Sequence, residues 1–192
     1  MTAPERTGEA AMAAGATRML LTSDGSTTLL LEALLGCRLT VQVDRQELVP
    51  APRLDPAAIA ALDLAAEGAA VERISALRTP GGVSVSRNTV VFTAPPAGWS
   101  GSAKDLAPLG KRLREQRTRQ HREVLSSGSA VWAEDGQNRP CAYKAYVITC
   151  DDGRRLYVHE RFSPDHVRLP ADDWPGRDAA AGAERARQPL TG

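Results

Sequence analysis

Cysteine, aromatic residues and an excess of charge of either sign are all scarce in this chain of 192 residues. Three cysteines (Cys37, Cys141 and Cys150) are too few and too scattered for a disulfide framework or a cysteine-based zinc site, which favours a reducing compartment and a cytoplasmic location. Aromatic residues make up 4% of the chain, so base-stacking platforms and aromatic carbohydrate grooves are not expected. The formal net charge is +1, which disfavours nucleic-acid binding through overall positive charge.

The chain also lacks sequence motifs typical of a membrane span, a cofactor site or a catalytic nucleophile. No apolar run approaches the roughly 18 residues that cross a bilayer, so no membrane partner is expected. The glycine pattern of dinucleotide sites is absent, and Gly110-Lys111 lacks both the upstream glycine and the following Ser or Thr of a phosphate loop. No Gly-x-Ser-x-Gly elbow occurs, and the histidines lack metal-ligand spacing. We therefore expect a site that uses neither a metal nor a cofactor.

Both ends of the chain are poor in large apolar side chains. Residues 1–16 are small and polar, and residues 170–192 are rich in Ala, Arg, Gly and Pro. Such segments bury too little surface to offset their conformational entropy, so disordered tails are predicted at both ends. The folded domain is then expected over residues 17–169.

Within that domain, hydrophobic periodicity and turn residues predict alternating helices and hairpins. Helices are predicted over about 26–36, 57–67 and 108–125, and strands over about 39–48, 71–78, 83–92, 141–150 and 155–162. Gly36 suits a helix C-cap, and Asp55 before Pro56 suits a helix N-cap. Because adjacent strands are joined by tight turns, the pattern predicts an α+β domain with a mainly antiparallel sheet.

Six basic residues fall within the twelve residues 111–122. On a helix they would be spread around much of the circumference, and no aromatic residues lie among them. A solvated helix is therefore preferred to a nucleic-acid interface. Steep salt dependence of DNA or RNA retention would support the alternative.

Four charged residues fall on strand faces that are otherwise apolar. Strand residues two apart point the same way, and this phase places Arg45, Arg73, Arg87 and Glu160 with core residues. A buried charge must be paired or bound to a ligand. Three arginines against one glutamate leave positive charge that a small dianion could neutralise, and the arginine fork suits carboxylates. The simpler alternatives are an Arg73–Glu160 ion pair, an edge position for Arg87 and a solvent-reaching Arg45.

Two predicted helix starts add backbone donors that attract anions. They lie at 25–28 and 107–110, where the first N–H groups of a helix have no partner within the helix. This signal is weak alone, because every helix has such an end.

Four short blocks, in order along the chain, resemble the chorismate pyruvate-lyase (4-hydroxybenzoate synthase) family in its actinobacterial branch. The blocks are Leu20-Leu21-Thr22-Ser23-Asp24-Gly25-Ser26-Thr27-Thr28, Val71-Glu72-Arg73-Ile74, Ala107-Pro108-Leu109-Gly110 and Val158-His159-Glu160-Arg161-Phe162. The resemblance covers roughly residues 18–168. It implies an antiparallel sheet of about six strands with helices over an enclosed ligand site. Residues 50–68 align poorly, and Thr27 replaces a larger apolar residue.

The resemblance also implies an activity and residue roles. It implies a monomeric, cofactor-free lyase that converts chorismate into 4-hydroxybenzoate and pyruvate. Arg73 would bind the ring carboxylate together with main-chain N–H groups at Thr27 and in the Leu109-Gly110 segment. Glu160 would contact the 4-hydroxyl group. Arg87 would bind the enolpyruvyl carboxylate or serve ligand passage, and Arg45 is a weaker candidate for the same role.

Two alternatives to this lyase remain open from the sequence. The first is a non-catalytic binding module for an aromatic acid, since the ligand-sensing domains of some bacterial repressors resemble the same fold. Sixteen N-terminal residues are expected to be too few for a DNA-binding domain of the kind that such repressors carry. The second is a lyase that acts on a related chorismate-derived acid.

Overall fold

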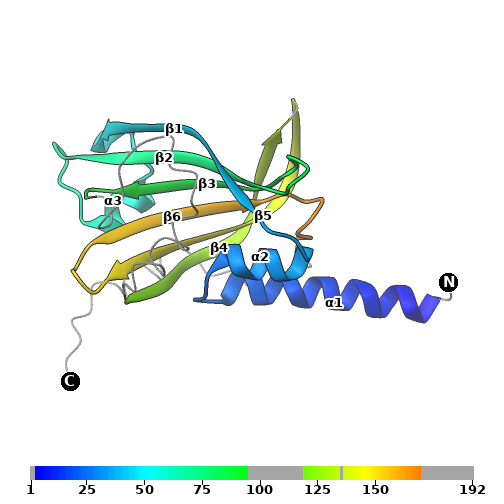
Figure 1. The fold of residues 1–192 in the computed structure, drawn as a ribbon. Helices are drawn as coiled ribbons and strands as arrows, with labels where there is room; N and C mark the ends of the chain where they lie inside the picture. The colour runs from blue at the N-terminus through cyan, green and yellow to red at the C-terminus, as the bar shows by residue number, and fades with distance from the viewer. Residues whose placement is uncertain (1–2, 95–118, 135, 170–192) are drawn as a thin grey trace, which may run out of the picture.

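One antiparallel sheet of six strands, in the order β1-β2-β3-β6-β5-β4, organises the part of the chain that the structure describes (Figure 1). The computed structural model describes residues 3–94, 119–134 and 136–169. The strands are β1 (Thr40–Pro50), β2 (Ala69–Arg78), β3 (Ser84–Phe92), β4 (Gln120–Glu134), β5 (Gln137–Cys150) and β6 (Arg155–Phe162). The helices are α1 (Ala3–Thr22), α2 (Thr27–Leu35), the short 3-10 helix η1 (Ala51–Arg53) and α3 (Pro56–Leu62). The α+β class and the mainly antiparallel sheet predicted from the sequence are confirmed.

Glycines at the hairpin turns explain why adjacent strands pair. Gly82 between β2 and β3 and Gly153 between β5 and β6 both have φ of 81°, a conformation that side chains rarely adopt. Each donates its backbone N–H back across the turn, Gly82 to Thr79 and Gly153 to Cys150. Both hairpins were predicted from these turn residues, and both are present.

Local capping sets the end of α2 and the start of α3 as predicted. Gly36 closes α2 in the left-handed conformation, with φ of 63°. The Asp55 side chain accepts a hydrogen bond of 2.8 Å from the backbone N–H of Ala57 at the start of α3. Helix α3 ends at Leu62, earlier than predicted, because Asp63 turns into the left-handed conformation.

The helices cover different faces of the sheet. The pair α1 and α2 packs Leu20, Leu21 and Leu31 against Val41, Leu77 and Phe162 on one face. We call this the pocket face, because it carries the cavity described below. Helix α3 packs Ala58 and Ala61 against Val91 and Tyr157 on the opposite face. Figure 1 shows α1 and α2 side by side at one end of the sheet, with α1 extending beyond it toward the N-terminus.

Two segments differ from the sequence-based prediction. Residues 1–16 were expected to be a tail, but α1 begins at Ala3. The helix predicted over 108–125 overlaps β4, which begins at Gln120, while residues 108–118 lie outside the described part. The predicted C-terminal tail, 170–192, also lies outside it. Among the helices in the described ranges, none combines the length and the apolar character needed to cross a bilayer.

Helix α2 offers a direct test of this packing. Leu31 is 0% exposed and Leu29 is 43% exposed on the same helix. Replacing a fully buried leucine with alanine leaves a cavity, so Leu31→Ala should lower the free energy of unfolding by about 3 kcal/mol. Leu29→Ala should change it by less than about 0.5 kcal/mol. Urea unfolding followed by circular dichroism measures both, and equal losses would contradict the assigned core.

Candidate functional site

A small, partly open cavity lies on the pocket face, between the sheet and the N-terminal end of α2. Its volume is about 60 Å³. Strands β1 to β6 all contribute to its wall, and α2 contributes its first turn. The described lining residues are Ser26, Thr27, Thr28, Val41, Arg73, Ser75, Leu77, Asn88, Val90, Arg122, Tyr146, Ile148, Val158 and Glu160.

Two arginines supply positive charge to the cavity. Arg73 on β2 is 4% exposed, and its Nη1 donates to Gln46 Oε1 at 3.1 Å. Arg122 on β4 is half-buried, and its Nη2 donates to Gln120 Oε1 at 2.6 Å. Three strands separate β2 from β4 in the sheet, so the two guanidinium groups enter the cavity from different sides. Both glutamine side chains are neutral acceptors, so these two hydrogen bonds orient the guanidinium groups.

A row of buried polar residues crosses the pocket face at one register level. Ser127 pairs with Lys144, Lys144 with Glu160, Glu160 with Asn88, and Asn88 with Ser75. All five side chains are buried. We call this set the polar row. Its Ser75, Asn88 and Glu160 members line the cavity, so the row delivers polar groups to the site from three neighbouring strands.

Three polar atoms in the cavity wall form no well-aligned hydrogen bond. Within the described part of the chain, five buried side-chain atoms form none, and three of the five are Thr27 Oγ1, Asn88 Oδ1 and Glu160 Oε2. All three residues line the same cavity, where the Thr27 hydroxyl and the Tyr146 phenol act to lower the pKa of the Glu160 carboxyl. An unsatisfied buried polar group costs about 1–3 kcal/mol, so their clustering marks a place where a ligand can supply the missing partners.

The buried charges of the polar row alter one another's ionisation. Burial raises the pKa of the Glu160 carboxyl, while the Lys144 ammonium opposes this by favouring the carboxylate. Burial lowers the pKa of Lys144, and the Glu160 carboxylate opposes that shift. Each charge is therefore tolerated inside the domain mainly because the other is present.

The arrangement suits an organic anion that also carries a hydrogen-bond donor. Guanidinium groups bind carboxylates through paired hydrogen bonds, and the oxygens of Asn88 and Glu160 accept from a hydroxyl or amine. A metal is a poorer match. Within the described ranges, no three His, Cys, Asp or Glu side chains gather closely enough to hold an ion.

The structure brings three of the sequence-predicted site residues together. Arg73, Glu160 and Thr27 all line the cavity. Strand phase alone pointed to Arg73 and Glu160, and the resemblance pointed to Thr27. Leu109 and Gly110 lie outside the described residues.

Arg45 is not brought to the cavity, because a β-bulge reverses the phase of β1. Val43 pairs with Ser75 and Arg45 with Ile74, which leaves Asp44 as the extra residue. Beyond the bulge, residues that would have faced the cavity turn to the opposite side of the sheet. The prediction that Arg45 shares a face with Val43 is therefore wrong. Its guanidinium instead binds Glu47 at 2.7 Å and Glu72 at 2.6 Å.

A second bulge displaces Arg87 in the same way. Leu77 pairs with Ser86 and Arg78 with Ser84, so Val85 is the extra residue on β3. Val85 stays in the core of the pocket face, but Arg87 turns to the opposite face, and the predicted shared phase of these two residues is wrong. There the Arg87 guanidinium binds Asp44 at 2.6 Å.

Sequence reasoning missed Arg122, Asn88 and Lys144. Arg122 was assigned to a solvated helix, and no signal identified its segment as a strand. Lys144 carried a readable signal, because it falls between Ala142 and Tyr146 on the apolar face of a correctly predicted strand. Asn88 could be placed only once the bulge at Val85 was known.

His159, next to Glu160 in the sequence, points to the other face of the sheet. Its ring stacks on Tyr143, with centroids 5.2 Å apart and planes inclined by 19°. Burial lowers the pKa of His159, and the charge of Arg161 lowers it further. The residue therefore contributes an aromatic surface to the fold and no group to the cavity.

Comparisons with known proteins find similarity only at the level of structure. No family model and no curated protein matches the sequence. PhnF from Mycobacterium smegmatis matches with a TM-score of 0.56 and 16% identity over 76% of this chain and 67% of that one. The effector domain of PhnF matches with a TM-score of 0.55 and 16% identity over 74% and 91%. A possible transcriptional regulator, YydK from Bacillus subtilis, matches with a TM-score of 0.54 and 11% identity over 68% of this chain and 61% of that one.

These similarities establish the fold and correct one expectation. The expectation that the chain is a chorismate pyruvate-lyase is wrong: the solved structures it matches include an effector domain and a possible transcriptional regulator, and none of these three is named as a lyase. The sheet of six strands implied by the resemblance is present all the same.

His159 provides a test of the ionisation described above. Because its pKa in the folded state lies below the ordinary value of 6.5, the unfolded chain takes up a proton first as the pH falls. Stability is therefore complete above about pH 6.5 and is lost as the pH falls through the lowered pKa. His159→Phe keeps an aromatic ring opposite Tyr143 without a titrating group and should flatten this pH dependence. Urea unfolding between about pH 7.5 and about pH 5 measures it, and identical pH profiles would contradict the assignment.

Proposed function

We propose that this chain is a non-catalytic domain that binds a small organic acid, of the aromatic hydroxy-acid type, in the cavity on the pocket face. The observation that carries the proposal is the clustering of three buried polar atoms without a well-aligned hydrogen bond, on Thr27, Asn88 and Glu160, in a cavity flanked by two arginines. A cavity of about 60 Å³ is far too small for a nucleotide or a lipid.

Recognition divides between the two kinds of group. The carboxylate of the ligand lies against Arg73, whose planar fork matches its two oxygens. A hydroxyl of the ligand donates to Glu160 or Asn88, which face each other across β6 and β3. A ligand that lacks either group leaves a buried partner unsatisfied, so the site selects for both.

The fold is consistent with a binding role. One solved structure of similar fold is an effector domain, and another belongs to a possible transcriptional regulator. A domain of this shape can respond to a small molecule without transforming it, because binding requires only complementary groups, whereas catalysis requires tighter binding of a transition state.

A matched set of three ligands tests the proposal. Isothermal titration with 4-hydroxybenzoate, benzoate and phenol separates the contribution of the carboxylate from that of the hydroxyl. We expect 4-hydroxybenzoate to bind most tightly, with benzoate and phenol each weaker by about tenfold or more, the cost of one unpartnered buried group. Equal affinity for all three would contradict recognition by both groups.

The paired variants Arg73→Gln and Arg45→Gln provide the protein control. Arg73→Gln should weaken 4-hydroxybenzoate binding by about tenfold to a hundredfold, because a charged hydrogen bond is lost. Arg45→Gln makes the same chemical change on the opposite face of the sheet and should leave the affinity unchanged. Unaltered binding to Arg73→Gln would refute the proposed site.

A further inference from the structure

Lys144 is a buried cation that joins the sheet to the end of helix α1. Its side chain is 1% exposed. Its Nζ donates to the carbonyl oxygen of Leu20 at 3.0 Å and to that of Ser23 at 2.9 Å. Leu20 lies in the last turn of α1 and Ser23 follows its end, so one ammonium satisfies carbonyl groups that the helix leaves open.

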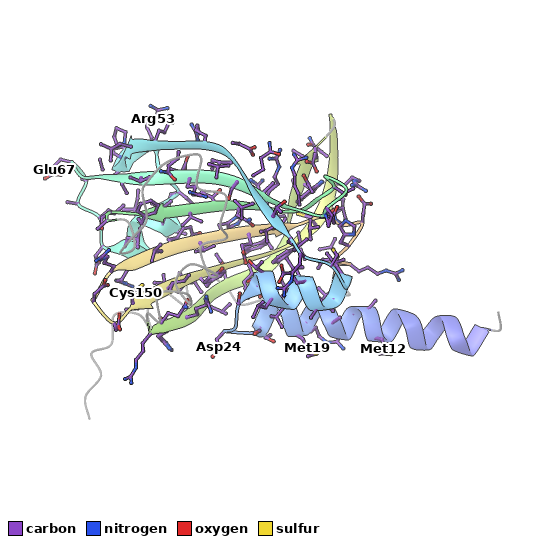
Figure 2. All side chains as sticks on the ribbon, in the orientation of Figure 1. Met12, Met19, Asp24, Arg53, Glu67 and Cys150 are labelled. Atoms are coloured by element: carbon purple, nitrogen blue, oxygen red, sulfur yellow. The ribbon has the colours of Figure 1, made fainter. Side chains whose placement is uncertain are left out.

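The same contact fixes a wall of the cavity. Only four residues, 23–26, separate the end of α1 from Thr27, the first residue of α2. Thr27 lines the cavity together with Ser26 and Thr28. By holding the Ser23 carbonyl, Lys144 therefore sets where the first turn of α2 stands over the sheet. Figure 2 shows Asp24 in this connection, between the two helices.

Charged groups of the site also act on the Lys144 ammonium electrostatically. Glu160 on β6 lies directly opposite it in the strand register, and the Tyr146 ring centroid is 5.2 Å from its Nζ. Arg122 on β4 and Asp24 in the turn before α2 also act on its charge, the first unfavourably and the second favourably. The ammonium thus lies between the cavity and helix α1 and responds to the charge on either side.

We propose that Lys144 is a positioning residue that transmits occupancy of the cavity to the C-terminal end of α1; the ligand-dependent half of this inference rests on the function proposed above. An anion in the cavity adds negative charge near the ammonium and strengthens its hold on the two carbonyls. Loss of negative charge in the cavity weakens that hold, because a buried ammonium without a counter-charge is costly.

The length of helix α1 amplifies a displacement at its C-terminal end. Its 20 residues span about 30 Å, and Figure 1 shows most of that length extending away from the sheet. Met12 and Met19 on this helix are 79% and 69% exposed, and Figure 2 shows both on its outer side. A small shift at Leu20 therefore moves the distant end of the helix through a larger arc.

A mutant cycle without any ligand tests the connection. Hydrogen exchange of residues 19–26 is measured by mass spectrometry in wild type, Glu160→Gln, Lys144→Met and the double variant. The pH is about 8, on the alkaline side, because burial raises the pKa of the Glu160 carboxyl and the test requires the carboxylate. We expect Glu160→Gln to speed exchange in this segment by about tenfold in the wild-type background and to have no effect in the Lys144→Met background. Glu72→Gln is the matched control: it removes a carboxylate that binds Arg45 on the other face and should leave residues 19–26 unchanged.

A second arm adds 4-hydroxybenzoate as the probe. It should slow exchange of residues 19–26 in wild type and leave it unchanged in Lys144→Met at a probe concentration that saturates the variant. If Lys144 were only structural, replacing it would loosen α1. Glu160→Gln and the probe would then still change hydrogen exchange in this segment.

The outcomes separate the two proposals. Independent, additive effects of the two substitutions overturn the role of Lys144, whatever binds in the cavity. A probe that fails to bind, combined with the expected cycle, overturns the ligand class and supports the connection. If Lys144→Met does not fold, Lys144→Gln replaces it, and unchanged exchange in Glu160→Gln alone is sufficient to overturn the inference.

Discussion

Burying an ammonium and a carboxyl in a small domain is the constraint on which the rest of this structure depends. Lys144 is withdrawn from water, and the cost of that burial is offset by two carbonyl oxygens of the α1 end and by the carboxyl of Glu160. Helix α1 must therefore end where Lys144 can reach it. The short connection to α2 then leaves little freedom in where α2 begins, so the position of both helices follows from one buried charge.

Hydrogen bonding is uneven along the polar row that contains this pair. At the Lys144 end, the protein itself supplies the partners. At the Asn88 and Glu160 end, an amide oxygen and a carboxyl oxygen form no well-aligned hydrogen bond, and neither does the Thr27 hydroxyl of α2. Evenly satisfied rows stabilise a core, whereas a row with one open end is costly without a ligand. The open end of the row lies in the cavity wall, where β2, β3 and β6 contribute Ser75, Asn88 and Glu160.

Strand phase predicted part of this site, and the reason for its failures is local. The alternation of side chains located Arg73 and Glu160 correctly, because β2 and β6 are regular where these residues lie. It misplaced Arg45 and Arg87, because one extra residue in β1 and one in β3 reverse the phase beyond them. A bulge depends on how a strand meets its neighbour, so a single sequence does not display it.

The helices and strands show the same contrast between features that nearby residues determine, which were predicted, and features that distant contacts determine, which were not. Gly82, Gly153, Gly36 and Asp55 act within a few residues of themselves, and the turns and helix ends they predicted are present. Strand β4 was missed over its whole length, Gln120–Glu134, and closely spaced charges suggested a solvated helix as far as residue 125. Its conformation is set by pairing with β5 along its whole length, a long-range contact that outweighs local preference. Helix α1 was missed because residues 1–16 offer few large apolar side chains from which a helical pattern could be predicted.

The same residues suggested both a lyase and a binding domain, and the chemistry explains why the two were hard to separate. An arginine for a carboxylate and a glutamate for a hydroxyl are needed to hold an aromatic hydroxy acid in either case. Catalysis also requires these groups to bind a transition state more tightly than the bound acid. Short motifs do not reveal that difference. A response to a ligand requires instead a physical connection from the site to a segment of the molecule that can move. Lys144 provides such a connection, because it pairs with Glu160 in the strand register and donates a hydrogen bond to the end of α1, and none of the four resembling blocks contains it.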